Sequence, residues 1–173
     1  MAILDFIQTH MRCPILDKTM ITLTWAGQAG LVWVALTLVL LCIKRTRKTA
    51  LAMGAALLIT LLVCNIILKP LIARPRPCWL NPNGCTLIPT PKDFSFPSGH
   101  AMSSFAAAWP LRCLNKKTGA LALLFAGLIA FSRMYLYVHY LTDVLAGAFF
   151  GIGAGMLGVF VVSYNKGSFE QSM

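Results

Sequence analysis

The segment from Ser132 to Asp143, SRMYLYVHYLTD, places an arginine, a histidine and an aspartate between two apolar runs. His139 and Asp143 are four residues apart, so on a helix they would share one face about one turn apart. A carboxylate in that place orients one imidazole nitrogen and leaves the other free to act as a nucleophile or base. Arg133 adds a planar donor fork suited to phosphate. The same spacing also fits a purely structural hydrogen-bonded pair.

A basic segment lies further upstream. The residues from Lys69 to Pro77, KPLIARPRP, follow an apolar run and present Lys69, Arg74 and Arg76. On its own, this segment is typical of a basic cluster that flanks a membrane span and contacts anionic lipid.

A third polar segment, Phe96 to His100 with the sequence FPSGH, comes at the entrance to the next apolar run. Ser98 is suited to capping the helix that follows. Gly99 lets the backbone approach a ligand, and the helix N-terminus attracts an anion. Taken alone, His100 is more often a polar group at a membrane interface.

The composition decides the environment of these groups. The 173 residues are 58% hydrophobic, with a mean hydropathy of +0.74, too high for an ordinary soluble globule. Apolar runs of about 20 residues, the length that crosses a bilayer, recur along the chain. We therefore predict one all-α domain over residues 1–173, an integral membrane helical bundle with about five transmembrane helices. The predicted spans are Ile21–Ile43, Ala50–Leu68, Ala101–Leu114, Gly119–Tyr137 and Leu141–Tyr164.

The remaining segments have distinct characters. Residues 1–18 are too short and too charged to span, and are expected to form a short interfacial helix. Residues 69–98 form the long polar loop, which is too rich in proline for a continuous helix. Gly147, Gly151 and Gly155 recur at four-residue spacing in the last span, which permits close contact between helices.

The net charge of +10 predicts orientation. The cations lie between apolar spans and are not interleaved with exposed aromatic residues, so we expect a bilayer partner and no nucleic acid. One face holds eight cations, and we expect it to be cytoplasmic, with the C-terminus inside and the 69–98 loop extracytoplasmic. These cations are Lys44, Arg45, Arg47, Lys48, Arg112, Lys116, Lys117 and Lys166.

The six cysteines show no metal-binding pattern. Cys78 and Cys85 share the polar loop, and either a disulfide in an oxidising compartment or two free thiols fits their spacing.

The predicted topology brings the three polar segments to one membrane face. Three cations, two histidines, a serine and a carboxylate then meet in a chain with few polar residues, and burying them is costly unless they are paired or bind something. An oxyanion would satisfy them. The alternative from another class is a small anion transporter or channel.

In their order and spacing, KPLIARPRP, FPSGH and SRMYLYVHYLTD resemble the three-part signature of the type 2 phosphatidic acid phosphatase (PAP2) superfamily. The resemblance spans Lys69 to Asp143 and implies a membrane lipid phosphatase that needs no metal and no cofactor. The six-residue gap after the lysine favours Arg76 over Arg74 in the signature, leaving Arg74 as a candidate contact to a lipid headgroup.

By this resemblance, His139 attacks phosphorus and becomes a phosphohistidine, Asp143 holds its ring, and His100 protonates the leaving oxygen. The phosphoryl oxygens are expected to be held by Lys69, Arg76, Ser98, Gly99 and Arg133. The expected substrate is a lipid phosphate or diphosphate of the cell membrane, with undecaprenyl diphosphate slightly preferred over phosphatidic acid or phosphatidylglycerol phosphate. Haloperoxidase-like chemistry is disfavoured by the composition, and a catalytically inactive binding protein is disfavoured by the intact histidines.

Overall fold

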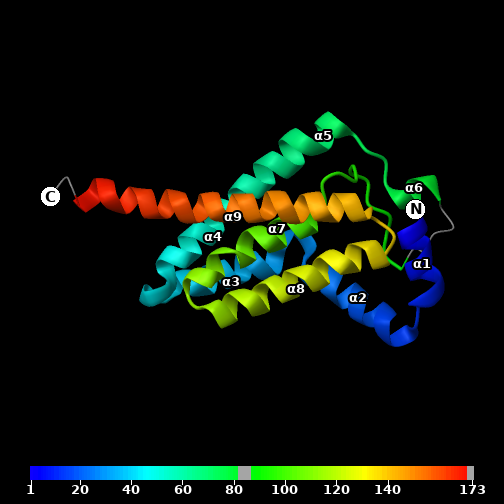
Figure 1. Cartoon of the computed structure of the whole chain (residues 1–173), viewed down its shortest axis with the longest axis horizontal. Coiled ribbons are helices and arrows are strands. Elements are labelled where there is room, and N and C mark those ends of the chain that lie inside the picture. The colour runs from blue at the N-terminus through cyan, green and yellow to red at the C-terminus, as the bar shows by residue number, and fades with distance from the viewer. Residues whose placement is uncertain (82–86, 171–173) are drawn as a thin grey trace.

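A computed structural model describes residues 1–81 and 87–170, with side chains described as far as residue 163. Every regular element in these ranges is a helix, so the predicted all-helical bundle is confirmed (Figure 1). Three helices are long and apolar enough to cross a membrane, or up to four if one bent pair counts as a single span. The three are Lys44–Leu80, Lys116–Tyr135 and Leu141–Ser163.

The first predicted span is not one straight helix. Helices α2 (Pro14–Ala26) and α3 (Leu31–Cys42) meet at an angle of 45° across a short 3₁₀ turn. Ala29 and Gly30 have φ values of 49° and 69°, in the left-handed region where a right-handed helix cannot continue. This break within the apolar run becomes part of the functional site.

The second span is longer than predicted. Helix α4 (Arg47–Thr60) continues through a π-helix (Leu61–Leu68) into α5 (Lys69–Ile72). It ends where Ala73 adopts a left-handed conformation, shortly before Pro75. The predicted loop therefore starts with one more helical turn, which carries Lys69, and later contains the short helix α6 (Pro77–Leu80).

The third predicted span is the ten-residue helix α7 (Gly99–Ala108), extended by the 3₁₀ turn Pro110–Cys113. This helix is too short to count among the spans, and most of its residues are buried. Helices α4, α8 (Lys116–Tyr135) and α9 (Leu141–Glu170) pack around it. The number of long spans is therefore below the predicted five, because one apolar run is a short central helix.

The predicted interfacial helix is α1 (Ala2–His10), which has a structural role as well. Its buried residues Leu4 and Ile7 pack with Leu136, Tyr137 and Val138 of the loop between α8 and α9. The N-terminal helix therefore covers and supports the loop that carries His139.

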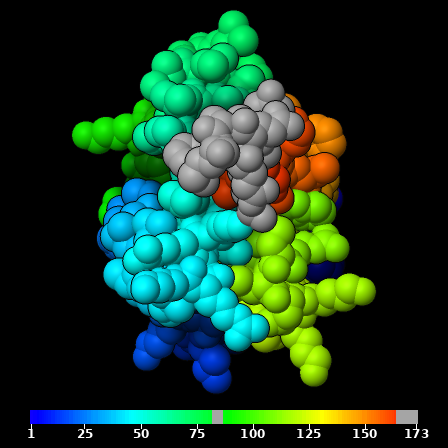
Figure 2. All heavy atoms as spheres, turned by 90° about the vertical axis from the view of Figure 1, so that its left-hand side faces the viewer, coloured from blue at the N-terminus to red at the C-terminus, as the bar shows by residue number. Residues whose placement is uncertain are grey.

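The two ends of the bundle differ in character (Figure 1). One end holds α1, α6 and the α8–α9 loop, and the other holds the α3–α4 turn, the start of α8 and the C-terminus. Figure 2 views the second end, where the α3–α4 turn and the start of α8 lie side by side. Seven of the eight cations used to predict orientation lie in or next to the α3–α4 turn and the start of α8. The side chain of the eighth, Lys166, lies outside the described part. Cys85 also lies outside it, so its pairing with Cys78 stays a prediction.

The glycines of α9 bring that helix against α7, as their spacing predicts. A Cβ atom at Gly147 would lie 2.7 Å from the backbone oxygen of Ser98, and one at Gly151 would lie 2.4 Å from that of Met102. Real Cβ atoms do not approach so closely, so only glycine allows this contact. The packing fixes the start of α7, which carries His100, against the start of α9, which carries Asp143.

We expect Gly151→Ala to lower the melting temperature, because its methyl group would clash with a backbone atom that no rotamer can move. Overpacking of this kind typically costs about 1–3 kcal/mol. Gly153→Ala is the matched control, since nothing lies within 4 Å of its Cβ position. Thermal unfolding of both variants in detergent measures the difference, and equal melting temperatures would contradict the close contact.

Candidate functional site

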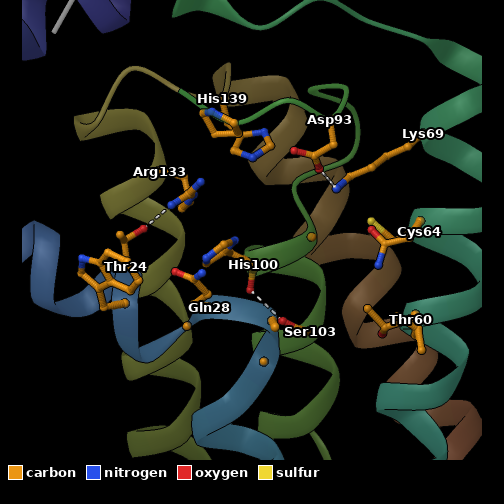
Figure 3. A pocket seen from close by; sticks show the side chains of 18 of the residues that line it. Thr24, Gln28, Thr60, Cys64, Lys69, Asp93, His100, Ser103, Arg133 and His139 are labelled. Atoms are coloured by element: carbon orange, nitrogen blue, oxygen red, sulfur yellow. Dashed lines mark hydrogen bonds and ion pairs between the residues drawn. The ribbon is translucent and has the colours of Figure 1, made fainter. Parts of the chain in front are cut away.

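A cavity of about 760 Å³ opens where the three polar segments meet (Figure 3). Its wall combines the α2–α3 break, the π-helix, the loop before α7, the start of α7 and the end of α8. Six of the eight predicted site residues line it, while Ser98 and Asp143 lie behind the wall. The six are Lys69, Arg76, Gly99, His100, Arg133 and His139.

His139 and Asp143 meet, but not on one helix as expected. Tyr137 has a φ of 59°, which ends α8, so His139 lies in a loop and Asp143 in the first turn of α9. Both side chains are buried, and Nδ1 of His139 lies 3.6 Å from Oδ2 of Asp143. That carboxylate also accepts a hydrogen bond of 2.9 Å from the backbone N–H of Tyr140, which fixes the start of α9.

Arg76 determines which tautomer the His139 ring adopts. Its Nη1 lies 3.0 Å from Nε2 of His139 and donates to the carbonyl oxygen of Val138 at 2.8 Å. A guanidinium is always protonated and only donates, so Nε2 of His139 accepts. The ring hydrogen of the neutral imidazole is then on Nδ1, facing Asp143. The lone pair of Nε2 accepts from Arg76, and both residues line the cavity.

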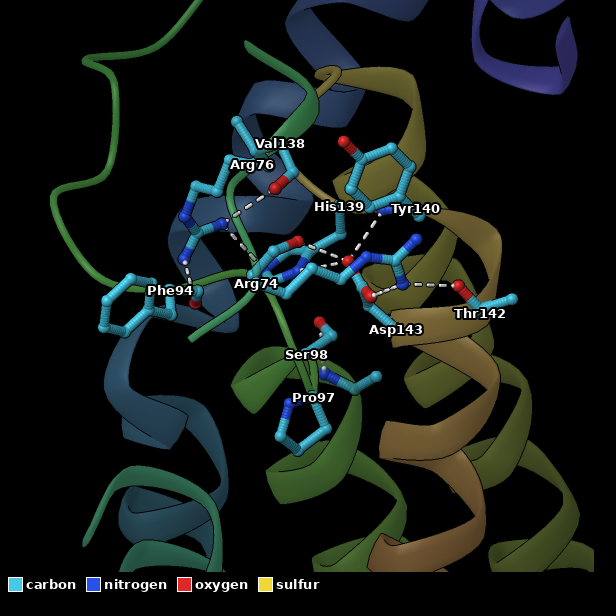
Figure 4. A network of polar contacts seen from close by, with 12 residues as sticks. Arg74, Arg76, Phe94, Pro97, Ser98, Val138, His139, Tyr140, Thr142 and Asp143 are labelled. Atoms are coloured by element: carbon cyan, nitrogen blue, oxygen red, sulfur yellow. Dashed lines mark hydrogen bonds and ion pairs between the residues drawn. The ribbon is translucent and has the colours of Figure 1, made fainter. Parts of the chain in front are cut away.

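Arg74 does not line the cavity, and its expected contact with a lipid headgroup stays a prediction. Its Nη1 donates to Oδ1 of Asp143 at 2.7 Å and to the hydroxyl of Thr142 at 2.8 Å (Figure 4). Its guanidinium also lies over the ring of Tyr140, 4.0 Å from the centroid. Arg74 therefore holds the buried carboxylate that faces His139, and Arg76 is the arginine of the cavity.

Asp93 is a residue that sequence reasoning missed. Its carboxylate accepts hydrogen bonds from Nζ of Lys69 and, at 2.8 Å, from Nη2 of Arg76. Partial burial acts to raise the pKa of Asp93, but the bond from Lys69 and the charge of Arg76 outweigh it and lower the pKa to about 2. Asp93 therefore stays charged at neutral pH, and an incoming oxyanion must share these cations with it or displace it.

Ser98 caps α7, as its place before that helix predicts, and its contact with a phosphoryl oxygen stays a prediction. Its hydroxyl oxygen caps α7 by accepting from the N–H of Ala101 at 3.5 Å. Its own N–H donates to the carbonyl oxygen of Asp143 at 3.0 Å. The neighbouring Ser95, also unforeseen, donates its hydroxyl to the Asp143 carboxylate. Both serines tie the segment before α7 to the start of α9.

The remaining predicted groups line the cavity and leave unpartnered polar atoms or open space there. Nη1 of Arg133 donates to the hydroxyl of Thr24 on α2, while its Nε has no partner within the described residues. Nε2 of His100 is buried and likewise unpartnered in that part of the chain. A Cβ at Gly99 would lie 3.7 Å from Nζ of Lys69, so the absence of a side chain leaves open space beside this cation.

The electrostatic environment keeps His139 neutral. Burial lowers the pKa of His139 to about 3, and the charges of Arg76 and Arg133 act in the same direction, against the Asp143 carboxylate, which raises it. An unprotonated imidazole with an oriented lone pair, beside three cations, suits attack on an anionic electrophile. The described residues contain no group of three or more His, Cys, Asp or Glu side chains placed to hold a metal ion.

Comparisons with known proteins agree with this arrangement. An undecaprenyl-diphosphatase from Sulfolobus acidocaldarius is 35% identical over 134 residues, which cover 76% of this chain and 64% of that protein. The chain thus spans less than two thirds of that relative. The crystal structure of Aquifex aeolicus LpxE matches with a TM-score of 0.75 and 28% identity, covering 91% of this chain and 93% of that one.

A second crystal structure, of a transmembrane PAP2-type phosphatidylglycerolphosphate phosphatase from Bacillus subtilis, matches with a TM-score of 0.67 and 27% identity. It covers 99% of this chain and 84% of that one. The model of the PAP2 superfamily matches residues 49–167, a range that contains all three polar segments. Sequence, fold and family model agree, and the chain belongs to the PAP2 superfamily.

Proposed function

We propose that this protein is a membrane lipid phosphatase that works without a metal, with His139 as its nucleophile. The observation that carries the proposal is the neutral His139 imidazole, whose Nε2 accepts from Arg76 and which lines the cavity together with Lys69, Arg76 and Arg133. These cations can stabilise the charge on a phosphoryl group during transfer.

In the first step, Nε2 of His139 attacks phosphorus as the bond from phosphorus to the leaving oxygen breaks. His100, whose Nε2 is unpartnered in the described residues, takes up a proton with the anionic substrate and gives it to that oxygen. The Nδ1 hydrogen of His139 stays on the ring and faces Asp143, so the phosphorylated imidazole carries a positive charge that the buried carboxylate stabilises.

In the second step, water attacks the phosphohistidine. His100, now unprotonated, takes a proton from this water as the bond between nitrogen and phosphorus breaks. Inorganic phosphate leaves, and both histidines return to their starting states. These two steps balance without a cofactor.

One wall of the cavity is apolar, which supports a lipid substrate. Trp25, Val34, Leu58 and Leu61 line it and are exposed, so the cavity opens sideways between α2–α3 and the second span. An acyl or isoprenyl chain can stay in the bilayer while the headgroup reaches His139. We prefer undecaprenyl diphosphate, which the name of the Sulfolobus acidocaldarius relative favours, over phosphatidic acid or phosphatidylglycerol phosphate.

We further propose that the site faces the extracytoplasmic side of the cell membrane and the C-terminus the cytoplasm. The basic α3–α4 turn and the start of α8 lie at the end away from the site, and basic residues favour the cytoplasmic face. An anion transporter is the competing function, and it would move the anion without cleaving it, so phosphate release distinguishes the two.

We expect the purified protein in detergent to release phosphate from one of undecaprenyl diphosphate, phosphatidic acid and phosphatidylglycerol phosphate, with EDTA having no effect. His139→Ala should abolish release, and Arg133→Ala should slow it by roughly 10²-fold or more, because it removes a donor from the transition state. His10→Ala, which alters an exposed histidine on α1, is the control. Release that survives in His139→Ala would contradict the mechanism.

The space beside Gly99 gives a second prediction. A Cβ there would make only ordinary contacts of 3.6–4.0 Å, so Gly99→Ala should fold normally. Its methyl group would occupy room next to Lys69 that a phosphoryl oxygen needs. We expect unchanged thermal unfolding but at least about tenfold weaker inhibition by orthovanadate, a mimic of the transferred group. Unchanged inhibition would mean that the anion does not bind beside Gly99.

A further inference from the structure

The cavity contains a second set of polar side chains that the proposed mechanism does not use. Gln28, Thr60 and Asn65 all line the wall, and none makes a side-chain hydrogen bond within the described chain. The Thr60 hydroxyl oxygen is fully buried without a partner. The side chains of Gln28 and Asn65 are exposed, so their amides can reach a ligand in the cavity.

Gln28 borders the proton donor. It lies in the α2–α3 break, where Gly27 packs so closely on α7 that a Cβ there would be 3.1 Å from Cδ2 of His100. Figure 3 shows the Gln28 side chain beside His100 on the cavity side. The bend in the first membrane segment thus brings an amide to the place where the leaving oxygen must be.

Asn65 borders the phosphoryl cradle from the opposite wall. Its Oδ1 lies 4.0 Å from the Cβ position of Gly99, close to Nζ of Lys69, which lies 3.7 Å from the same point. Asn65 belongs to the π-helix, in which residues four to five apart lie on one face, so it stands one turn below Lys69. This wider turn directs both side chains into the same cavity.

Resting on the proposed function, we propose that Gln28 and Asn65 bind the second phosphate of a lipid diphosphate, the one that remains on the leaving group. When a monophosphate ester is cleaved, the leaving oxygen is joined to carbon, which needs no further donors. When a diphosphate is cleaved, the same oxygen is joined to another phosphorus, whose two non-bridging oxygens share a negative charge.

The chemistry divides the donors of the cavity into two sets. Lys69, Arg76 and Arg133 surround the phosphoryl group that His139 accepts. The bond between the terminal phosphorus and the bridging oxygen breaks, His100 protonates that oxygen, and a lipid monophosphate departs. The amide N–H groups of Gln28 and Asn65 then remain as the donors for the departing phosphate.

The test compares kcat/KM for farnesyl diphosphate and farnesyl monophosphate in detergent. The variants are Gln28→Met and Asn65→Leu, which keep side-chain volume but remove the amide. We expect each to lower kcat/KM for the diphosphate by about tenfold or more, the effect of losing a hydrogen bond to a charged group, and to change the monophosphate less than about twofold. Activity on the monophosphate also reports correct folding.

Thr22→Val is the control, because Thr22 is exposed on α2 and does not line the cavity. Its ratio of the two kcat/KM values should equal that of the wild type. Equal losses on both substrates in Gln28→Met and Asn65→Leu would overturn the inference. So would wild-type protein that hydrolyses only the monophosphate, although the proposed phosphatase would stand. Hydrolysis of neither ester, nor of any lipid in the phosphate-release assay, would overturn the phosphatase itself.

Discussion

The buried carboxylate of Asp143 is the interaction on which the rest of the site depends. A charge without solvent must be compensated, and four groups from three segments do so: Arg74 after α5, Ser95 before α7, and the N–H of Tyr140 and the ring of His139 in the α8–α9 loop. Each of these partners belongs to, or lies next to, one of the three motif segments. Satisfying one buried charge therefore assembles segments that are up to 69 residues apart in the sequence.

Helix packing turns this assembly into a fixed geometry. The glycines of α9 let α7 approach within backbone contact, so His100 is held near the start of α9. Helix α1 covers the α8–α9 loop through Leu4 and Ile7 and keeps His139 from solvent. Burial in turn keeps the imidazole neutral, since it lowers the pKa of His139 to about 3. Packing, protonation state and reactivity are thus consequences of one arrangement.

The sequence predicted the parts that depend on local pattern and motif spacing. Apolar length predicted the helical bundle, and the three motifs predicted the residues that meet in the cavity. Three features depend on contacts distant in the chain and were not predicted: the role of Arg74, the carboxylate of Asp93 between two cations, and the bond from Ser95 to Asp143. Gly27 and Gly30, on either side of Gln28, signal the α2–α3 break. The apolar run continues through them, so hydropathy alone predicted a single helix. The expected helix around His139 does not form, because Tyr137 adopts a left-handed conformation.

The central claim is that Nε2 of His139 carries the phosphoryl group between lipid and water. The most direct test is to quench the protein in base during turnover of a substrate labelled with ³²P in its terminal phosphate, and to locate the label by peptide mass spectrometry. The account predicts acid-labile phosphate on His139, absent from His139→Ala. Rapid turnover with no labelled protein, or label on another residue, would contradict it.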